Sequence, residues 1–477
     1  QFSTSSLAAY VNDSFTNGDV YCTAIGATNN SGLSASQPRT TLQSLLTDYD
    51  FGPGDVIYID TGLYTNTAQF NVADSGSTSV PIRVLGVTNE GTVINAGLSL
   101  PGIQLSGANY ISVSNITFLR NQTGIDVIGS SLGNTFGNNV FSRNSTGVSF
   151  NPGSATAMDR LAFDRNTLGL RVVSGSGLTL DRASFWANTN HIDMGSSSTA
   201  LSVSNSIFAG GIKAFAGTGS PNQSNYLLFW NVLFGGSYNN LYDYQKAKNI
   251  SWQSTYADPL FVAADSTNLH VRSMAGTYDR VSGTFFTDTV HSVAIDFGDP
   301  SRLVGGETAP NGGRLNIGTY AGTPLAARSL TNAQLLALSL QDGGQLTLGD
   351  TVYWQSLNFS PSDTVRIEFS GDGGFSWGVA ASNLLASAGS YVWTTTNFTS
   401  SSLSRWRVVS EGDPGVLSGT VSNFTLRNGV FKYYLNDTST NADLYCTAVG
   451  NDANGGTTPV SPKLTLTNLL ASADLEP

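Results

Sequence analysis

Five phenylalanines recur at nearly constant spacing in the first half of the sequence. They are Phe118, Phe141, Phe163, Phe185 and Phe208, separated by 23, 22, 22 and 23 residues, and the first four are each followed three residues later by Asn121, Asn144, Asn166 or Asn188. A period near 22 with three short strand-like segments fits one coil of a right-handed parallel β-helix, because stacked coils bury a core that no single coil could bury. An antiparallel sandwich or propeller with coincidental spacing is the alternative.

The in-register stacking of coils predicts ladders of like residues about 4.8 Å apart. We expect the phenylalanines to stack inside and the asparagines to pair their amides at a turn. Asparagine tolerates left-handed backbone, so we expect positive φ at that turn. Gly124, Gly147 and Gly169 mark a second position where positive φ is expected.

Charge is sparse and acidic in this chain of 477 residues. Charged residues make up 12%, and 22 Lys and Arg against 33 acids give a formal net charge of −11. This balance argues against nucleic acid as a partner, since no basic patch is present to displace phosphate counterions. The sequence also contains no apolar stretch long enough for a membrane span and no signal peptide, so any such signal lies outside this segment or has been removed.

Residues 10–53 occur a second time as residues 434–477. The offset is a constant 424 residues, and 20 of the 44 aligned positions are identical. Tandem arrays have this appearance over one period. We therefore interpret 1–9 as the end of a preceding module or a linker, 10–53 as the start of one module, and 429–477 as the start of the next, with the chain ending part-way into it.

Each copy of this segment carries one cysteine, Cys22 or Cys446. We do not expect a disulfide between them, because equivalent positions of successive modules lie too far apart. A buried free thiol at each module junction is the preferred interpretation, and an intermolecular bridge is the alternative.

The duplicated segment contains a helical pattern. Leu42, Leu45, Leu46 and Tyr49 lie at helical spacing, with Pro38 before them and Gly52-Pro53-Gly54 after them. We predict an amphipathic helix from Arg39 to Tyr49. A β-helix has open ends that expose strand edges, so this helix is expected to cap the first coil.

Two stretches resemble a known family. "PRTTLQSLLTDYDFGPGDVIYIDTGLYT" is similar to the start of secreted parallel β-helix proteins of the pectate-lyase-like superfamily, and "ADPLFV" to "NIGTYAGTP" is similar to the closing segment of bacterial members. The resemblance covers roughly Tyr10 to Ala326 and implies a β-helix over 54–326. It also implies polysaccharide lyase or hydrolase activity as one possible function, although these motifs specify fold better than activity.

Residues 327–428 have a different pattern. Short alternating strands separated by Gly, Asp or Ser turns predict an antiparallel β-sandwich, which resembles an Ig-like or fibronectin type III-like module. Within it, "SGDGGFSW" resembles the Asp-box of sialidases, formed here by Ser370, Asp372, Gly374 and Trp377. That resemblance implies a hairpin turn in which Asp372 accepts amide hydrogens while Trp377 packs below, and no chemistry. Core packing is preferred for Trp377 over contact with carbohydrate.

Candidate catalytic residues are few. Asp159 and Asp181 each lie four residues before a ladder phenylalanine, so stacking would place them about 5 Å apart, which suits a retaining glycosidase pair. An exposed charge ladder neutralised by the adjacent arginines is the preferred alternative. Arg143 and Arg165 also align and could bind an acidic polysaccharide, or could cover an outer turn with their aliphatic stems.

We expect neither a metal site nor a cofactor. His191, His270 and His291 lack metal-ligand spacing, and no nucleotide-binding fingerprint or calcium-binding repeat is present.

Two functions follow as hypotheses. The first is a structural repeat module of a large extracellular or cell-surface protein, in which neighbouring copies of the module are the partners and form a fibre or filament, joined in one chain or as separate subunits. The second is a protein that binds or degrades polysaccharide.

Overall fold

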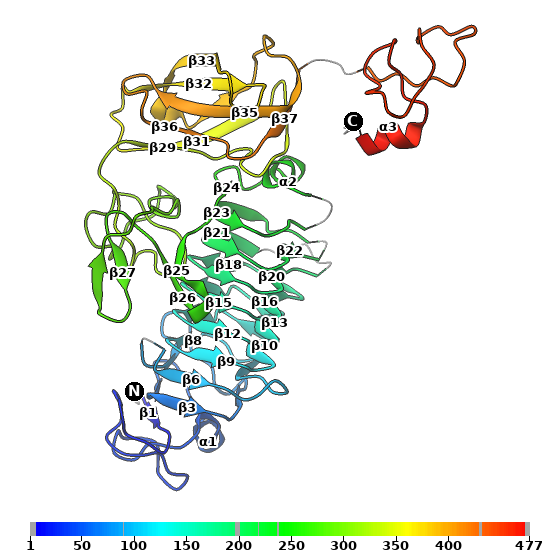
Figure 1. Cartoon of the computed structure of the whole chain (residues 1–477). Coiled ribbons are helices and arrows are strands. Elements are labelled where there is room, and N and C mark those ends of the chain that lie inside the picture. The colour runs from blue at the N-terminus through cyan, green and yellow to red at the C-terminus, as the bar shows by residue number, and fades with distance from the viewer. Residues whose placement is uncertain are drawn as a thin grey trace.

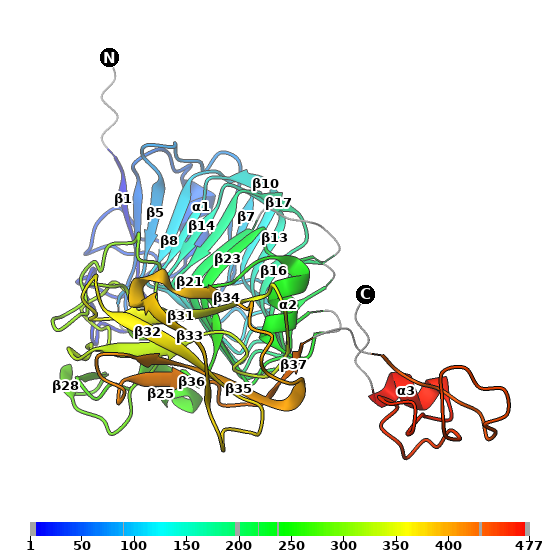
Figure 2. The same ribbon diagram turned by 90° about the horizontal axis from the view of Figure 1, so that it is seen from above.

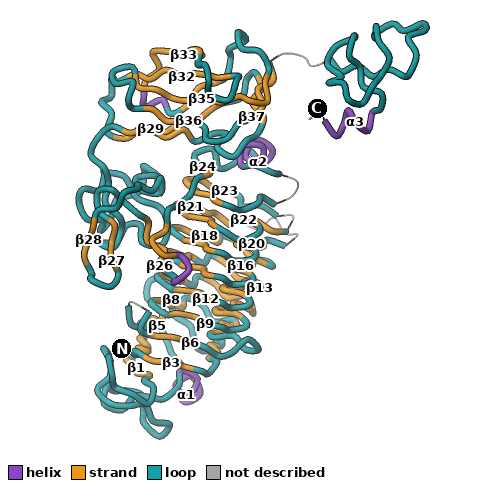
Figure 3. Tube along the Cα trace, viewed as in Figure 1, coloured by secondary structure: helices purple, strands orange, loops and turns teal. Residues whose placement is uncertain are grey.

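The computed structural model describes residues 6–88, 90–195, 201–217, 219–235, 238–428 and 432–472. A β-helix, an irregular segment, a β-sandwich and a small C-terminal unit follow one another along the chain (Figure 1). Strands make up most of the regular structure; within the described residues, α-helices lie at the ends of the β-helix and in the C-terminal unit, and short 3-10 turns lie in the irregular segment and the sandwich (Figure 3).

The β-helix is built from parallel strands on three faces. One face stacks β1 (Ala8–Val11), β2 (Val56–Ile59), β5 (Ile82–Leu85), β8 (Ile111–Ser114), β11 (Thr135–Gly137), β14 (Ala157–Asp159), β18 (Leu178–Asp181), β21 (Leu201–Ala209), β23 (Gln223–Trp230) and β24 (Thr255–Tyr256). The second contains β3 (Gly62–Tyr64), β6 (Thr92–Ile94), β9 (Thr117–Leu119), β12 (Val140–Ser142), β15 (Ala162–Asp164) and β19 (Ser184–Trp186), which pairs with the end of β21. The third contains β4 (Ala68–Phe70), β7 (Ile103–Ser106), β10 (Thr123–Leu132), β13 (Thr146–Ser154), β16 (Leu168–Val172), β20 (Asn190–Asp193) and β22 (Lys213–Ala216), with β17 (Gly175–Ser176) beside β13. The predicted parallel β-helix is confirmed.

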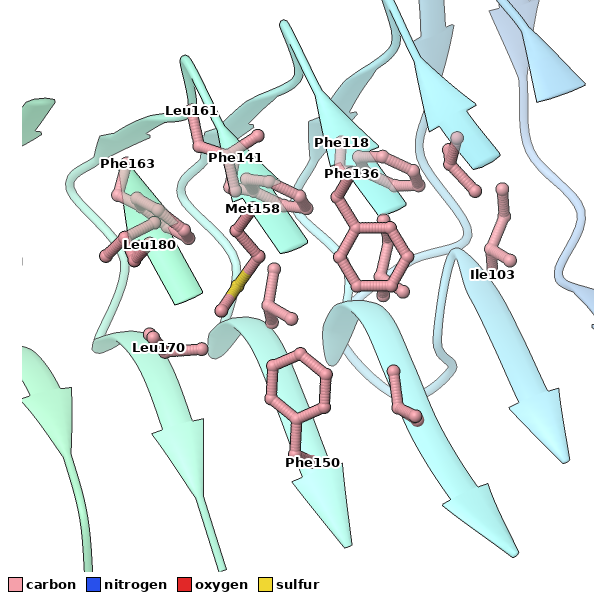
Figure 4. Close-up of a cluster of buried hydrophobic side chains, with 14 of the residues drawn as sticks. Ile103, Phe118, Phe136, Phe141, Phe150, Met158, Leu161, Phe163, Leu170 and Leu180 are labelled. Atoms are coloured by element: carbon pink, nitrogen blue, oxygen red, sulfur yellow. The ribbon is translucent and has the colours of Figure 1, made fainter. Parts of the chain in front are cut away.

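The phenylalanine ladder lies inside this helix. Strand register pairs each predicted phenylalanine with the next, and their rings stack with centroids 4.4 to 5.1 Å apart. Figure 4 shows Phe118, Phe141 and Phe163 in a row within the core. The stack continues to Phe229, 5.3 Å from Phe208, one coil beyond the predicted ladder.

The asparagine ladder is confirmed, but the ladder asparagines do not have the predicted positive φ. The Nδ2 atoms of Asn121, Asn144 and Asn166 each donate to Oδ1 of the next asparagine at 3.0, 3.0 and 2.8 Å. Positive φ falls instead on the residue before each asparagine, with φ 54° at Arg143 and 50° at Arg165. Asparagine is needed for its side chain, because the Asn144 amide donates to the Phe118 carbonyl and accepts from the Asn121 backbone amide in the preceding coil, while also donating to the Asn166 side chain in the following coil.

The prediction of positive φ at Gly124, Gly147 and Gly169 is also wrong, since none of the three has left-handed backbone. Lack of space explains the glycines. A Cβ atom on Gly147 would lie 2.5 Å from the Gly169 carbonyl oxygen and 2.8 Å from a ring carbon of Phe163. The ladder rings therefore exclude a side chain at this position of each coil.

The predicted cap helix forms at the start of the β-helix. Helix α1 (Leu42–Asp48) is shorter than predicted because Thr41 caps it, accepting a hydrogen bond from the Ser44 amide at 3.2 Å. Its leucines pack into the core of the β-helix. Strand β1 also begins at Ala8, so residues 8 and 9 belong to the first coil rather than to a linker.

The parallel coils end at β24, earlier than the predicted boundary at residue 326. Beyond it lie the antiparallel pairs β25 (Phe261–Ala263) with β26 (Asn268–Val271) and β27 (Thr277–Asp279) with β28 (Thr284–Phe286), and the 3-10 turn Ala264–Ser266. This irregular segment runs back along the flank of the β-helix (Figure 1). A separate apolar cluster holds it there, in which Ile207 and Leu228 pack with Phe297 and Ile317.

The predicted sandwich is also present. One sheet contains β29 (Gln334–Ala337), β31 (Thr351–Leu357) and β34 (Ser390–Val392), and the other contains β30 (Gln345–Thr347), β37 (Phe424–Arg427), β35 (Ser401–Ser410), β32 (Thr364–Ser370), β33 (Gly378–Leu385) and β36 (Leu417–Gly419), with the 3-10 turn Ala386–Ala388. All pairs are antiparallel except β30 with β37. Trp354, Trp393 and Trp406 lie in the core between the sheets.

A second cap helix, which the sequence analysis did not predict, joins the two domains. Helix α2 (Leu241–Lys248) places Tyr244 in the β-helix core and Tyr242 in the sandwich core. Lys246 forms an ion pair with Asp350 at 3.0 Å, and the Leu241 amide donates to Asp342 at 2.9 Å. The sandwich therefore lies directly on the last coil.

The C-terminal unit contains helix α3 (Leu466–Ser472) and lies apart from both domains, as Figures 1 and 2 show from two directions.

Candidate functional site

The two candidate catalytic aspartates are neighbours, as predicted. Asp159 and Asp181 are register partners on β14 and β18. Arg182 donates two hydrogen bonds of 2.8 and 2.7 Å to the Asp159 carboxylate, and the Arg160 guanidinium lies 3.2 Å from the same carboxylate. Asp159 is thus bound by two cations from successive coils.

Asp181 is enclosed more completely than an exposed charge ladder would be. Arg302, from the irregular segment, forms an ion pair with it, and Asn205 and Ser204 donate to its other oxygen at 2.7 and 2.9 Å. The side chain is buried. Every oxygen of the pair accepts a hydrogen bond or ion pair from the protein, as expected of carboxylates neutralised by neighbouring arginines.

The candidate arginines occupy the outer turn of successive coils. Arg143 is exposed, and Arg165 is bound to Asp164 at 2.8 Å and to the carbonyl of Asp265 at 2.7 Å. Arg165 therefore fastens the irregular segment to the coils. Arg143 and Arg165 follow β12 and β15, whereas Asp159 and Asp181 end β14 and β18 on another face of the β-helix.

The Asp-box-like turn has the predicted structure at the β32–β33 hairpin. Asp372 accepts from the Ser376 amide at 2.9 Å and from the Ser370 hydroxyl at 2.6 Å, and these hydrogen bonds lower the pKa of its carboxyl. The Gly374 amide donates to Ser370 at 2.8 Å. Trp377 is half-buried and lies outside the apolar cluster of the sandwich, so the preferred core packing is not found. Its ring is covered by the Arg407 guanidinium at 4.1 Å, and its Nε1 donates to the Gly374 carbonyl.

Metal-binding clusters of three or more His, Cys, Asp or Glu residues are absent from the described residues. Of the helices in this part of the chain, none is long and apolar enough to cross a membrane.

Burial lowers the pKa of His191 to about 3, and this imidazole packs edge-on against the phenylalanine ladder.

A cleft of about 610 Å³ lies between the β-helix flank and the irregular segment. His270 stacks on Tyr320 at 3.5 Å and lines it, while Arg280 and Glu90 form an ion pair of 3.0 Å at its wall. From the sequence, His270 was considered only as a metal ligand. Burial lowers its pKa to about 3, so the ring is uncharged near neutral pH.

The N-terminal copy of the duplicated segment is seated on the first coil. Asp60, directly after β2, accepts hydrogen bonds from the backbone amides of Val20, Tyr21 and Cys22 at 2.7, 2.8 and 2.5 Å. The Tyr21 ring packs on Tyr58 at 4.9 Å. One carboxylate of the coil thus fixes a whole loop of the segment.

The C-terminal copy has the same internal structure. Asn12 donates to Asp19 and to the Ala24 carbonyl at 2.7 and 2.8 Å, and the equivalent Asn436 donates to Asp443 and to the Ala448 carbonyl at 2.6 and 2.8 Å. Both cysteines are buried and form no disulfide within this chain. Burial also raises the pKa of the Cys22 thiol, so it is not a reactive thiolate.

The two copies differ in what covers them. Leu42 and Leu46 are each 7% exposed, whereas their equivalents Leu466 and Leu470 are 56% and 54% exposed. Val11 is fully buried against the first coil, and its equivalent Leu435 is 39% exposed. The C-terminal copy therefore presents, uncovered, the face that the N-terminal copy buries.

The duplication is visible in the sequence, but the residues of the first coil that bind the duplicated segment are not. Asp60 directly follows the run Val56–Ile59, so its position at the end of a strand is visible in the sequence. No sequence pattern indicates which groups bind its carboxylate. The partners are backbone amides, which leave no residue-type signal.

The fold defines a right-handed parallel β-helix protein with an appended β-sandwich. The family described as a right handed beta helix region matches residues 101–244. No curated protein matches the sequence.

Among solved structures, the chain is similar to two structures of GH136 lacto-N-biosidase from Eubacterium ramulus. The selenomethionine derivative has 9% identity and a TM-score of 0.30, and the native protein has 10% and 0.29; each match covers 48% of this chain and 56% of that chain. The chain thus spans about half the length of these proteins. Similarity at this level carries no inference about activity.

Proposed function

We propose that this chain is a structural module of a large extracellular or cell-surface assembly, in which β-helices and sandwiches alternate. The observation that carries the proposal is the pair of duplicated segments, one covering a first coil and the other folded with the same face uncovered. The neighbours are other copies of the module, arranged as a fibre or filament. The resemblance to secreted β-helix proteins supports the extracellular location.

The interior of the module suits a stiff spacer. Stacked phenylalanines and a continuous asparagine ladder link successive coils, and α2 joins the last coil to the sandwich core. The hydrogen bonds that the carboxylates of Asp159 and Asp181 accept from Arg182 and Asn205 support a structural role for these side chains as well.

Mass spectrometry of the native protein under denaturing conditions tests how modules are joined. The tandem arrangement predicts a species far heavier than this chain. A species of the mass of this chain alone would contradict the covalent version and favour separate subunits that associate through the same segment.

A second candidate function is saccharide binding in the cleft beside His270. Its volume falls in the range of small-molecule sites, and the stacked pair of Tyr320 and the uncharged His270 imidazole suits sugar rings and hydroxyls. Titration with neutral and acidic oligosaccharides, followed by calorimetry and product analysis, tests this function. Neither heat nor product with any glycan would remove its support.

A further inference from the structure

We infer that residues 434–472 form a docking site for the first coil of a second β-helix with the sequence of residues 54–70. This inference rests on the proposed function, and it specifies the contacts through which one module receives the next. The N-terminal copy serves as the template for those contacts, because both copies share the same internal hydrogen bonds.

The docking site lacks a carboxylate. In the N-terminal copy, Asp60 accepts from three consecutive amides, and the equivalent amides are those of Leu444, Tyr445 and Cys446. None of the described residues accepts a hydrogen bond from these three amides. An aspartate at the end of an incoming strand would fill this position with three charge-assisted hydrogen bonds.

The site also lacks its apolar cover. Leu466 and Leu470 lie on one face of α3 with Leu469 between them, and only Leu469 is buried. In the template, all three equivalent leucines lie in the β-helix core. Tyr445 is 79% exposed, whereas the equivalent Tyr21 packs on Tyr58 and donates to the Gly86 carbonyl at 3.0 Å.

The C-terminal copy also has an unpaired strand edge, at the segment equivalent to β1. Strand β1 pairs in parallel with β2, with Val11 opposite Ile59. In the C-terminal copy, Leu435 bridges to Lys463 within the copy itself, and no described strand pairs with its other side. An edge of this kind accepts an added strand.

These features together select one occupant. It must offer a parallel strand, an aromatic residue in the position of Tyr58 and a carboxylate in the position of Asp60, which the run "VIYID" provides. The coil 56–60 of this chain is already covered by its own residues 8–53. The occupant is therefore the first coil of a second copy.

The test uses the full chain extended after Pro477 by a second copy of residues 54–428, compared with the unextended chain. Hydrogen exchange is measured at the amides of Leu444, Tyr445 and Cys446. Docking predicts that the extension slows their exchange by roughly 100-fold, since they become part of the folded β-helix. Equal exchange in the two chains would overturn the inference.

Two variants of the extended chain make the test specific. Leu466→Asp combined with Leu470→Asp should restore fast exchange, and both residues are exposed in the unextended chain, whose stability should not change. Val460→Asp is the matched control, because Val460 is also exposed and its equivalent Ser36 stays exposed in the seated copy. Protection that survives the double substitution, or that Val460→Asp removes equally, would contradict docking through this face.

The second copy's Asp60→Asn provides an independent variant that leaves both leucines intact. It should raise the exchange rate of the three amides by about tenfold, because a neutral acceptor replaces a charged one. An unchanged rate would show that the carboxylate does not hold them. If docking fails but the native protein is far heavier than this chain, the inferred contact is refuted and the tandem arrangement stands. If the native protein has the mass of this chain alone, the tandem arrangement is refuted.

Discussion

At the residue scale, the residue type at each ladder position is determined by contacts with the preceding and the following coil. Phe118 to Phe208 and Asn121 to Asn188 could be predicted from the sequence because every coil repeats the same requirement. The backbone conformations could not. Arg143 adopts positive φ because the turn needs it there, although arginine carries no sequence signal for left-handed backbone.

Gly147→Ala tests the reason given for the ladder glycines. The added Cβ would meet the Gly169 carbonyl and the Phe163 ring, so we expect the free energy of unfolding to fall by about 1–3 kcal/mol, measured by denaturant titration. Gly412→Ala is the control, since its Cβ would meet nothing within 4 Å and its φ is not positive. A loss of stability no larger than that of the control would show that the ring does not exclude a side chain.

At the scale of elements, caps and joints depend on single contacts that do not repeat. The helix α1 was predictable from leucine spacing because its whole pattern lies in one short stretch. Helix α2 was missed, since its buried residues Tyr242 and Tyr244 face two different cores and give no single apolar stripe. The end of the coils at β24 was missed because residues 257–326 resemble the closing segment of a β-helix family without forming parallel strands.

The joint at α2 should depend on pH through Asp342. Burial raises the pKa of this carboxyl from 3.8 to about 7, and its Oδ1 atom has no hydrogen-bond partner. Between these values the folded chain keeps a proton that the unfolded chain has lost, so the free energy of unfolding falls as pH rises, by about 1 kcal/mol per pH unit. Above pH 7 the dependence ends.

Asp342→Asn should remove this dependence, because the amide can accept from Leu241 without carrying charge. The difference in melting temperature between the variant and the unmodified chain should grow from pH 4 to pH 7 in favour of the variant, then stay constant. Asp296 and Glu307, whose pKa values burial also raises, contribute equally to both proteins. The exposed Asp265→Asn serves as control, and a constant difference across pH 4 to 7 would contradict the assignment.

At the scale of the whole molecule, the chain consists of a β-helix and a sandwich joined through α2, followed by a separate unit that repeats the start of the β-helix (Figures 1 and 2). The duplication itself was visible in the sequence. What the sequence could not show is that one copy is seated and the other uncovered, since this difference lies in burial rather than in residue type. Under the function proposed here, the uncovered copy is the part of the chain that would contact a neighbouring module.

Electron microscopy of the native assembly tests this account most directly. A chain of modules predicts thin rods with a regular axial repeat longer than about 40 Å, the length of the stacked coils at about 4.8 Å each, since the sandwich adds to every repeat. Discrete globular particles, with neither fibres nor any periodic axial spacing, would contradict it.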